Sequence, residues 1–370
     1  MVNKKGLEKY LYRKIVERQE SITTDDREHV LTEEESNRLK KIQSRAMFRA
    51  ALAGTLGILL LYVPYHLWQR TLFPTTNVWF PLYNDYIEVG IIFLLYSLVL
   101  VVIEIAYLTY NNIQSVKDIA HACNYPMPED PFFEINMDSL IAVGLEKKIK
   151  SQSQIGINPF AGLSRAQVFL FTAFNLAKAA MTNFLFKLLV KRVFGRYAIR
   201  LLVDLAGIPV YAFWNAFAAR YVVREARVRI MANPIIRDFA NEIYEEQKDN
   251  PEFITELYYM LDLVAITKRK FHGNHYLLAL ITLDKFGIQP DPKHQYDADF
   301  LDRIEKSSPL TIQGFSKVNL LGMALDGTIS KKEELLIYKW RKKGIYNFTL
   351  EETKNACDEF FSGKGNISLV

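Results

Sequence analysis

Two stretches in the first third of the chain carry almost no charge. Ala50–Trp68 contains no Asp, Glu, Lys or Arg, and Val89–Ile103 is apolar except for Ser97. The helical pattern of the second stretch continues to Tyr110. Because about 20 apolar residues in a helix cross the ~30 Å hydrocarbon core of a bilayer, the pattern predicts two transmembrane helices.

The two stretches also carry features of membrane helices. Aromatic residues gather at the far end of the first one, where a span meets the interface: Tyr62, Tyr65 and Trp68. Small residues follow one another near its start at about one helical turn: Ala50, Ala53, Gly54 and Gly57. Such a face lets a second helix approach closely, so it also predicts a route to a homo-oligomer.

The flanking cations predict an orientation. Five of them precede the first stretch: Arg38, Lys40, Lys41, Arg45 and Arg49. Only Arg70 lies between the stretches, and Lys117, Lys147, Lys148 and Lys150 follow the second. Because Lys- and Arg-rich flanks stay on the cytoplasmic side, both termini are predicted to be cytoplasmic and the connecting loop external.

A third apolar region, 166–230, does not read as an ordinary pair of spans. Lys178 lies near the middle of its first segment, and a basic turn follows. We predict two apolar helices that lie at or in the membrane, with cations on anionic lipid headgroups: Lys191, Arg192, Arg196, Arg200, Arg220 and Arg224. Two true spans and a soluble helical core are the alternatives. The candidate polar residues within the membrane are Glu104, Lys178, Asp204 and Asn215.

The remaining segments are polar with helical periodicity. We predict a cytoplasmic helical arm at 1–45, the two-helix membrane hairpin at 46–112, a connector at 113–165, the apolar hairpin at 166–230, and a helical domain at 231–370. Capping boxes, in which a Ser or Thr is followed three residues later by Glu, occur at Thr32, Ser330 and Thr349. The predicted fold class is therefore all-α, a membrane protein with a cytoplasmic helical domain.

Composition changes this picture little. The 370 residues have a formal charge of +5 and two widely separated cysteines, which predict neither a disulfide framework nor a zinc site. The sequence contains no P-loop, nucleophile elbow, paired-glycine fingerprint or HExxH motif. We predict no catalytic residues and no nucleic-acid partner.

The segment "LFKLLVKRVFGRYAIRLLVDLAGIPVYAFWNAFAARYVVREAR" resembles the helical-hairpin core of EcsC-type bacterial membrane-associated proteins. The shared features are a basic apolar helix, the turn Ala206–Pro209, and a second apolar helix with Asn215 that ends in "REAR". The match covers about a sixth of the chain. It implies membrane association in a bacterial inner membrane, and it brings no catalytic residues.

Near the C-terminus, "DGTISKKE" has the form of the second half of an EF-hand loop. Gly322 and Ala324 stand where calcium needs oxygen ligands, so a normal calcium site is not expected. The surrounding Leu321–Gly344 resembles the TerB-like helical domain of membrane-stress proteins. That resemblance implies Asp326 and Glu333 as ligands of a divalent metal, the one cofactor considered.

Two local alternatives to metal binding are open in this region. Gly327 can form a turn while Ser330 and Glu333 cap the next helix. His272 and His275 have a spacing that suits one metal, but they also fit the start of a helix.

We predict a non-enzymatic inner-membrane scaffold or envelope-stress adaptor. It would bind membrane lipids and dock an unidentified cytoplasmic or membrane protein through its helical domain. The alternatives are a subunit of a transport or channel assembly, and an interfacial lipid-modifying enzyme.

Overall fold

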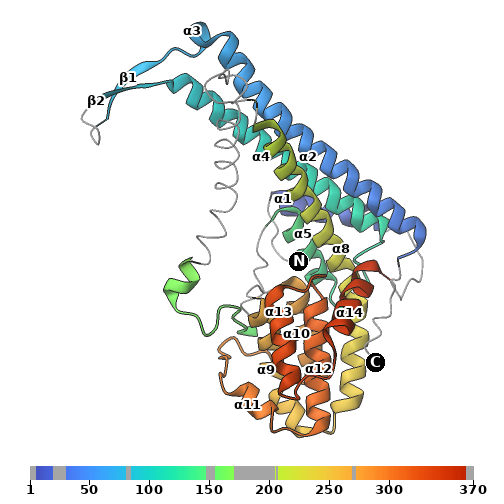
Figure 1. Ribbon diagram of the computed structural model, residues 1–370. Helices are drawn as coiled ribbons and strands as arrows, with labels where there is room; N and C mark the ends of the chain where they lie inside the picture. The colour runs from blue at the N-terminus through green and yellow to red at the C-terminus, as the bar shows by residue number, and fades with distance from the viewer. Residues whose placement is uncertain are drawn as a thin grey trace. The chain divides into compact units, whose positions relative to one another are not determined.

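The computed structural model describes residues 6–19, 31–80, 85–146, 155–170, 205, 207–268 and 272–363 (Figure 1). These residues form helices and one two-stranded hairpin, so the predicted all-α class is confirmed apart from the hairpin. They divide into two compact units. The helical domain comprises residues 1–39, 117–168 and 224–370, and the apolar unit comprises 40–116 and 169–223.

The elements in chain order are α1 Leu7–Gln19, α2 Glu33–Leu67, α3 Gln69–Leu72, β1 Thr76–Phe80, β2 Asp85–Val89, α4 Ile91–Ala122, α5 Phe133–Gly144, α8 Gly207–Gln247, α9 Pro251–Lys268, α10 Gly273–Lys285, α11 Phe300–Ile304, α12 Pro309–Ala324, α13 Lys331–Lys342 and α14 Leu350–Ser362.

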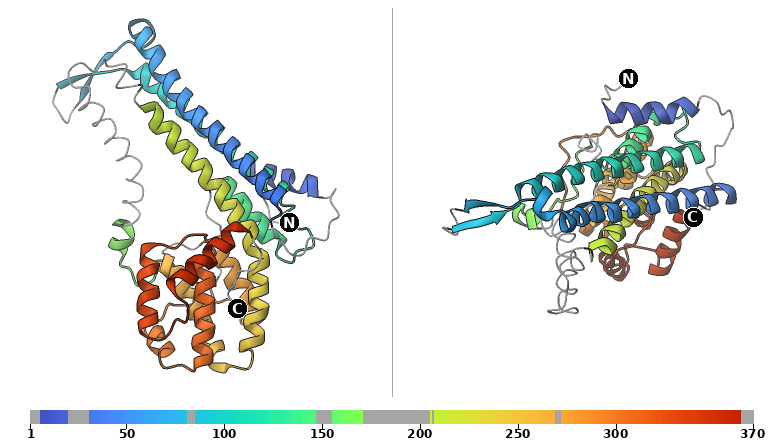
Figure 2. Two further views of the ribbon diagram at one scale, coloured as in Figure 1. Left: turned by 45° about the vertical axis from the view of Figure 1, so that its right-hand side comes forward. Right: turned by 90° about the horizontal axis from the view of Figure 1, so that it is seen from above.

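In the apolar unit, α2 and α4 run side by side (Figure 2). Asn111 Nδ2 donates a hydrogen bond of 3.1 Å to the carbonyl oxygen of Ala46, and Tyr96 Oη donates one of 2.7 Å to that of Leu60. At the other end of the pair, the ring centroids of Tyr65 and Phe93 are 4.4 Å apart. Polar contacts and a tilted aromatic pair thus join the two helices along their length.

Both helices are long and apolar enough to cross a membrane, as judged by length and composition. The most apolar 18-residue windows of α2 and α4 have mean hydropathies of 1.8 and 2.6. Each helix is longer than its predicted span, because α2 begins at Glu33 and α4 continues to Ala122 without a break. The predicted boundaries at 45/46 and 112/113 therefore fall inside continuous helices.

The connection between α2 and α4 contains a hairpin that the sequence pattern did not reveal. β1 and β2 pair antiparallel, from Thr76 opposite Val89 to Phe80 opposite Asp85. Pro74 and Pro81 predicted a loop here. The strands between and after them are rich in β-branched and aromatic residues, which favour extended structure, and this preference outweighs the two breakers.

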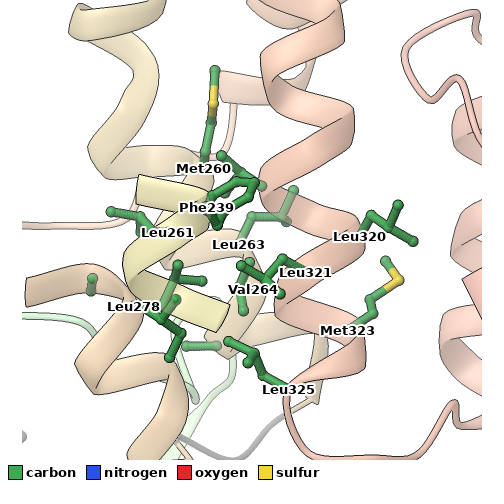
Figure 3. Packing of buried hydrophobic residues seen from close by; sticks show 14 of the residues in the cluster. Phe239, Met260, Leu261, Leu263, Val264, Leu278, Leu320, Leu321, Met323 and Leu325 are labelled. Carbon is green, nitrogen blue, oxygen red and sulfur yellow. The ribbon is translucent and has the colours of Figure 1, made fainter. Parts of the chain in front are cut away.

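The helical domain is built around one hydrophobic core, to which α8, α9, α10 and α12 contribute (Figure 3). Val264 of α9 and Leu321 of α12 lie together in it. Gly322 allows the close approach of these helices, because a Cβ atom there would lie 2.5 Å from a Val264 methyl group. Gly322, which occupies a position where an EF-hand has a calcium ligand, is thus required for helix packing.

The capping boxes predicted from sequence are present. The side chains of Ser330 and Thr349 accept hydrogen bonds from the backbone N–H of Glu333 and Glu352, whose carboxylates accept the reciprocal bonds. Thr32 and Glu35 make the same exchange at the start of α2. Each box satisfies backbone donors that a helix start otherwise leaves open.

A carboxylate also joins the starts of α9 and α12. Glu252 Oε2 accepts hydrogen bonds from the Ser308 backbone N–H at 3.0 Å and from the hydroxyls of Ser308 and Thr311 at 2.7 Å. The Ser308 bonds, followed by that from Thr311, lower the pKa of Glu252 from 4.5 to about 2.

We therefore expect Glu252→Gln to lower the free energy of unfolding by about 1–2 kcal/mol at pH 7. A lowered pKa stabilises the fold above the usual value and loses this effect as the carboxylate is protonated. The difference between variant and parent should shrink as pH falls from 4.5 towards 2. Chemical unfolding followed by circular dichroism tests this. A difference that stays constant over this pH range would contradict it.

Candidate functional site

Two of the four predicted intramembrane polar residues meet in the apolar unit. Asn215 Nδ2 on α8 donates a hydrogen bond of 2.7 Å to Glu104 Oε1 on α4. Both residues lie among apolar neighbours in their own sequences, so the bond joins the polar groups of two otherwise apolar helix segments. Lys178 and Asp204 lie outside the described residues, as do Lys191, Arg192, Arg196 and Arg200.

The small residues of α2 pack against this pair. A Cβ atom at Gly54 would lie 2.8 Å from both Asn215 Nδ2 and the carbonyl oxygen of Tyr211, and one at Gly57 would lie 3.3 Å from Glu104 Oε2. Glycine is required at position 54, and a side chain at position 57 would need Glu104 to shift by a few tenths of an ångström. The predicted small-residue face therefore packs against α4 and α8 of the same chain, and Gly54 is buried there. A homo-oligomer through the rest of this face stays a prediction.

We call Gly54, Gly57, Glu104 and Asn215 the polar clasp. A carboxylate in an apolar helix is costly unless a donor meets it, and the Asn215 amide supplies that donor. The clasp thus gives the first part of α8 a fixed partner on α4.

The predicted lipid-binding arginines of α8 lie in different surroundings. Arg220 is exposed. Arg224 belongs to the helical domain, where Nη2 donates to the carbonyl oxygens of Asp326 at 3.3 Å and Gly327 at 2.7 Å. Its guanidinium also lies 5.2 Å from the ring centroid of Phe361. Arg224 is therefore engaged within its own domain.

The turn that Arg224 contacts is the "DG" motif of the sequence. Gly327 has a φ of +70°, a left-handed conformation that favours glycine. Together with the Ser330–Glu333 capping box, this confirms that Gly327 forms a turn and that Ser330 and Glu333 cap the next helix.

A buried lysine lies between the two predicted metal ligands. Lys268 Nζ, at the end of α9, is 2.8 Å from Asp326 Oδ1, 2.8 Å from Glu333 Oε1 and 2.6 Å from the carbonyl oxygen of Thr328. The side chain of Glu333 is fully buried and that of Lys268 is 7% exposed. Burial opposes ionisation of Asp326, but the Lys268 ammonium and the nearby histidines outweigh it and lower the pKa of Asp326.

Within the described ranges, no group of three or more His, Cys, Asp or Glu side chains is placed to hold a metal ion. The Lys268 ammonium supplies the positive charge that a metal would supply to Asp326 and Glu333. Metal binding at these residues stays a prediction that this geometry does not favour.

The histidines near this cluster serve the fold. His272 is the N-cap of α10, where Nδ1 accepts a hydrogen bond from the Asn274 backbone N–H, which confirms the helix-start alternative. His275 Nε2 lies 2.9 Å from the carbonyl oxygen of Gly322. Burial, followed by the charge of His272, lowers the pKa of His275 to about 3, so His275 is neutral at physiological pH.

Sequence reasoning missed the acidic partner of His272. Glu225 Oε1 lies 2.5 Å from His272 Nε2 and 2.9 Å from Arg229 Nη2, and Arg229 Nη1 reaches Ser139 Oγ on α5 at 2.5 Å. The four-residue spacing of Glu225 and Arg229 was the available signal. A cavity of about 10 Å³ beside Arg229 has room for one water molecule.

No family model, curated protein or solved structure matches this chain. The resemblances to EcsC-type and TerB-like proteins therefore rest on the quoted motifs alone.

The Lys268 cluster makes a strong stability prediction. Lys268→Met leaves the buried carboxylate of Glu333 and the half-buried carboxylate of Asp326 without their cation, so we expect a loss of about 3–5 kcal/mol at pH 7, measured by urea unfolding. Because the pKa of Asp326 is lowered, its share of the loss should disappear as pH falls below 3.8.

The matched control is Lys248→Met, which removes an exposed lysine paired with Glu245 and should leave the free energy of unfolding almost unchanged, because solvent and salt screen an exposed pair. Equal stability losses in the two variants would show that the Lys268 cluster has no special role.

The polar clasp makes a separate prediction. Asn215→Leu keeps an apolar helix but removes the donor to Glu104, and we expect a loss of about 0.6–1.7 kcal/mol in detergent micelles. The readout is unfolding followed by tryptophan fluorescence, to which neighbouring Trp214 contributes.

Ser97→Ala is the control, because Ser97 Oγ donates a hydrogen bond of 2.8 Å to the carbonyl oxygen of Leu94 in its own helix. A clasp that contributes nothing would leave Asn215→Leu as stable as this control.

Proposed function

We propose that the chain is a membrane-anchored adaptor, in which α2 and α4 cross the bilayer and the helical domain docks a protein partner. The observation that carries this proposal is α4. Its most apolar window has a mean hydropathy of 2.6, and none of that window is buried inside the structure.

The exposure of α4 covers one broad face of the helix, while Phe93, Tyr96 and Leu100 on the other face are half-buried. Ten large apolar side chains on the broad face are 47–59% exposed: Ile91, Ile92, Leu94, Leu95, Leu98, Val99, Val101, Val102, Ile103 and Ile105. In water, a contiguous apolar surface of this kind is strongly unfavourable and leads to association. In a bilayer, lipid tails surround the apolar side chains of α4, so that no apolar surface is left in contact with water.

The cation distribution supports an orientation. Arg38, Lys40, Lys41 and Arg45 lie in the first part of α2, Lys117 lies near the end of α4, and Arg70 is the one Lys or Arg between the two apolar stretches. The positive-inside rule then assigns the helical domain to the cytoplasm and the β1–β2 hairpin to the external side.

An adaptor role fits the helical domain. The charged groups around Lys268 and His272 bind one another, and the cavity beside Arg229 has room for about one water molecule. Its surface is therefore the part available to a partner. The bacterial inner membrane and the envelope-stress role rest on the two motif resemblances.

The contact between Glu104 and Asn215 favours a second candidate, a subunit of a transport or channel assembly. Facing polar side chains inside a membrane mark many solute paths. We favour the adaptor over the channel subunit, because the helices pack closely at Gly54 and Gly57 and this packing fills the space beside the pair.

Cysteine labelling in intact bacterial cells tests the adaptor proposal. The natural cysteines, Cys123 and Cys357, are both buried, and burial raises the pKa of each thiol to about 12; they are replaced by Ala. In this background a membrane-impermeant maleimide should label Thr75→Cys in intact cells, and Lys306→Cys only after permeabilisation.

The chain should also stay in the membrane fraction after carbonate extraction. Labelling of Lys306→Cys in intact cells would refute the orientation. Recovery of the chain in the soluble fraction would refute the anchor.

A further inference from the structure

The outward face of α13 carries two large side chains that the helical domain leaves in solvent. Leu335 is 64% exposed and Tyr338 is 70% exposed. The opposite face of the same helix places Ile337 and Trp340 in the core, where they are 1% and 2% exposed. The helix therefore buries one apolar face and presents another.

Lysine side chains lie on the same exposed face of α13. At 100° per residue, Lys331, Leu335, Tyr338 and Lys342 lie within about 60° of one another, and Lys339 borders them. We call these five residues the α13 stripe. All five are exposed, and in the described part of the chain none of the three lysines forms an ion pair.

The acidic residues of α13 are already engaged elsewhere. Glu333 is buried against Lys268, and Glu334 Oε1 accepts a salt bridge of 2.6 Å from Lys354 Nζ. The outward face is thus positively charged, without a compensating carboxylate from its own helix.

We propose that the α13 stripe binds the anionic headgroup surface of a phospholipid membrane, with Leu335 and Tyr338 inserted among the headgroups. The proposal rests on the anchor proposed above, which keeps the helical domain tethered to a bilayer. The stripe has the composition of an interfacial helix, with lysines beside an aliphatic and an aromatic side chain.

The type of cation favours a lipid surface over an acidic protein. Lysine is a mobile point charge that suits a diffuse anionic surface, and it is depleted in protein interfaces, where arginine is enriched. Arg224 illustrates the contrast, because its guanidinium is fixed on two carbonyl oxygens and an aromatic ring. The three stripe lysines have no fixed acceptor among the described residues.

The test uses the full chain in lipid nanodiscs made of neutral phosphatidylcholine, with or without 30 mol% phosphatidylglycerol. A bimane fluorophore on Leu335→Cys, with Cys123 and Cys357 replaced by Ala, reports contact through quenching by nitroxide-labelled lipids. We expect quenching in the anionic discs and little in the neutral ones.

Lys331→Gln, Lys339→Gln and Lys342→Gln together should lower the ratio of quenched to unquenched probe on the order of 100-fold, about five-fold per cation. The matched control changes three exposed lysines of the same domain outside α13: Lys248→Gln, Lys285→Gln and Lys293→Gln. This control should leave the quenching unchanged.

Incorporation into neutral discs tests the anchor separately from the stripe. An unquenched probe in anionic discs that carry the chain overturns the stripe proposal and leaves an acidic protein as the occupant. Equal quenching in neutral and anionic discs overturns it too, because charge would then play no part. If the chain fails to enter discs, the anchor fails, and co-sedimentation of the soluble chain with anionic vesicles decides on the stripe.

Discussion

The apolar side chains of α4 must leave water, and the described part of the chain does not bury them. This constraint shapes the rest of the apolar unit. In the bilayer that we propose around α4, a helix is the suitable structure, because it satisfies its own backbone hydrogen bonds in a solvent that offers none. Close packing against α2 then stabilises the helix pair, because helices in lipid associate through van der Waals packing and polar contacts rather than through the hydrophobic effect. Within the polar clasp, Gly54 and Gly57 allow the helices to approach closely, and the hydrogen bond between Asn215 and Glu104 is the polar contact.

The chain meets the cost of buried charge in two ways. On α4, the Glu104 carboxylate receives a neutral amide donor from Asn215, which adds no second charge to an apolar region. In the helical domain, the Lys268 ammonium receives two carboxylates and a carbonyl oxygen. The second solution suits a well-packed core in which three segments meet, because an ion cluster needs several acceptors in fixed places.

The sequence predicted what depends on local pattern. Hydropathy located both candidate spans, and capping boxes placed the starts of α2, α13 and α14, because these signals lie within one helix or one turn. It failed where distant residues meet. The role of Lys268 depends on a turn some 60 residues away. No motif in the sequence around Lys268 indicates that contact. Gly54 and Gly57 were recognised as a packing face, but the partner helix was not, because α8 lies far along the chain. The β1–β2 hairpin was missed because Pro74 and Pro81 outweighed a strand preference spread over ten residues.

The course of α8 shows how one helix serves two surroundings. Its residues 207–223 belong to the apolar unit and its residues 224–247 to the helical domain. Asn215 fixes the first part to α4, and Arg224 fixes the second to the Asp326–Gly327 turn, nine residues later on the same continuous helix. The same helix therefore contributes one polar contact to the apolar unit and another to the helical domain, and each contact holds α8 within its own unit.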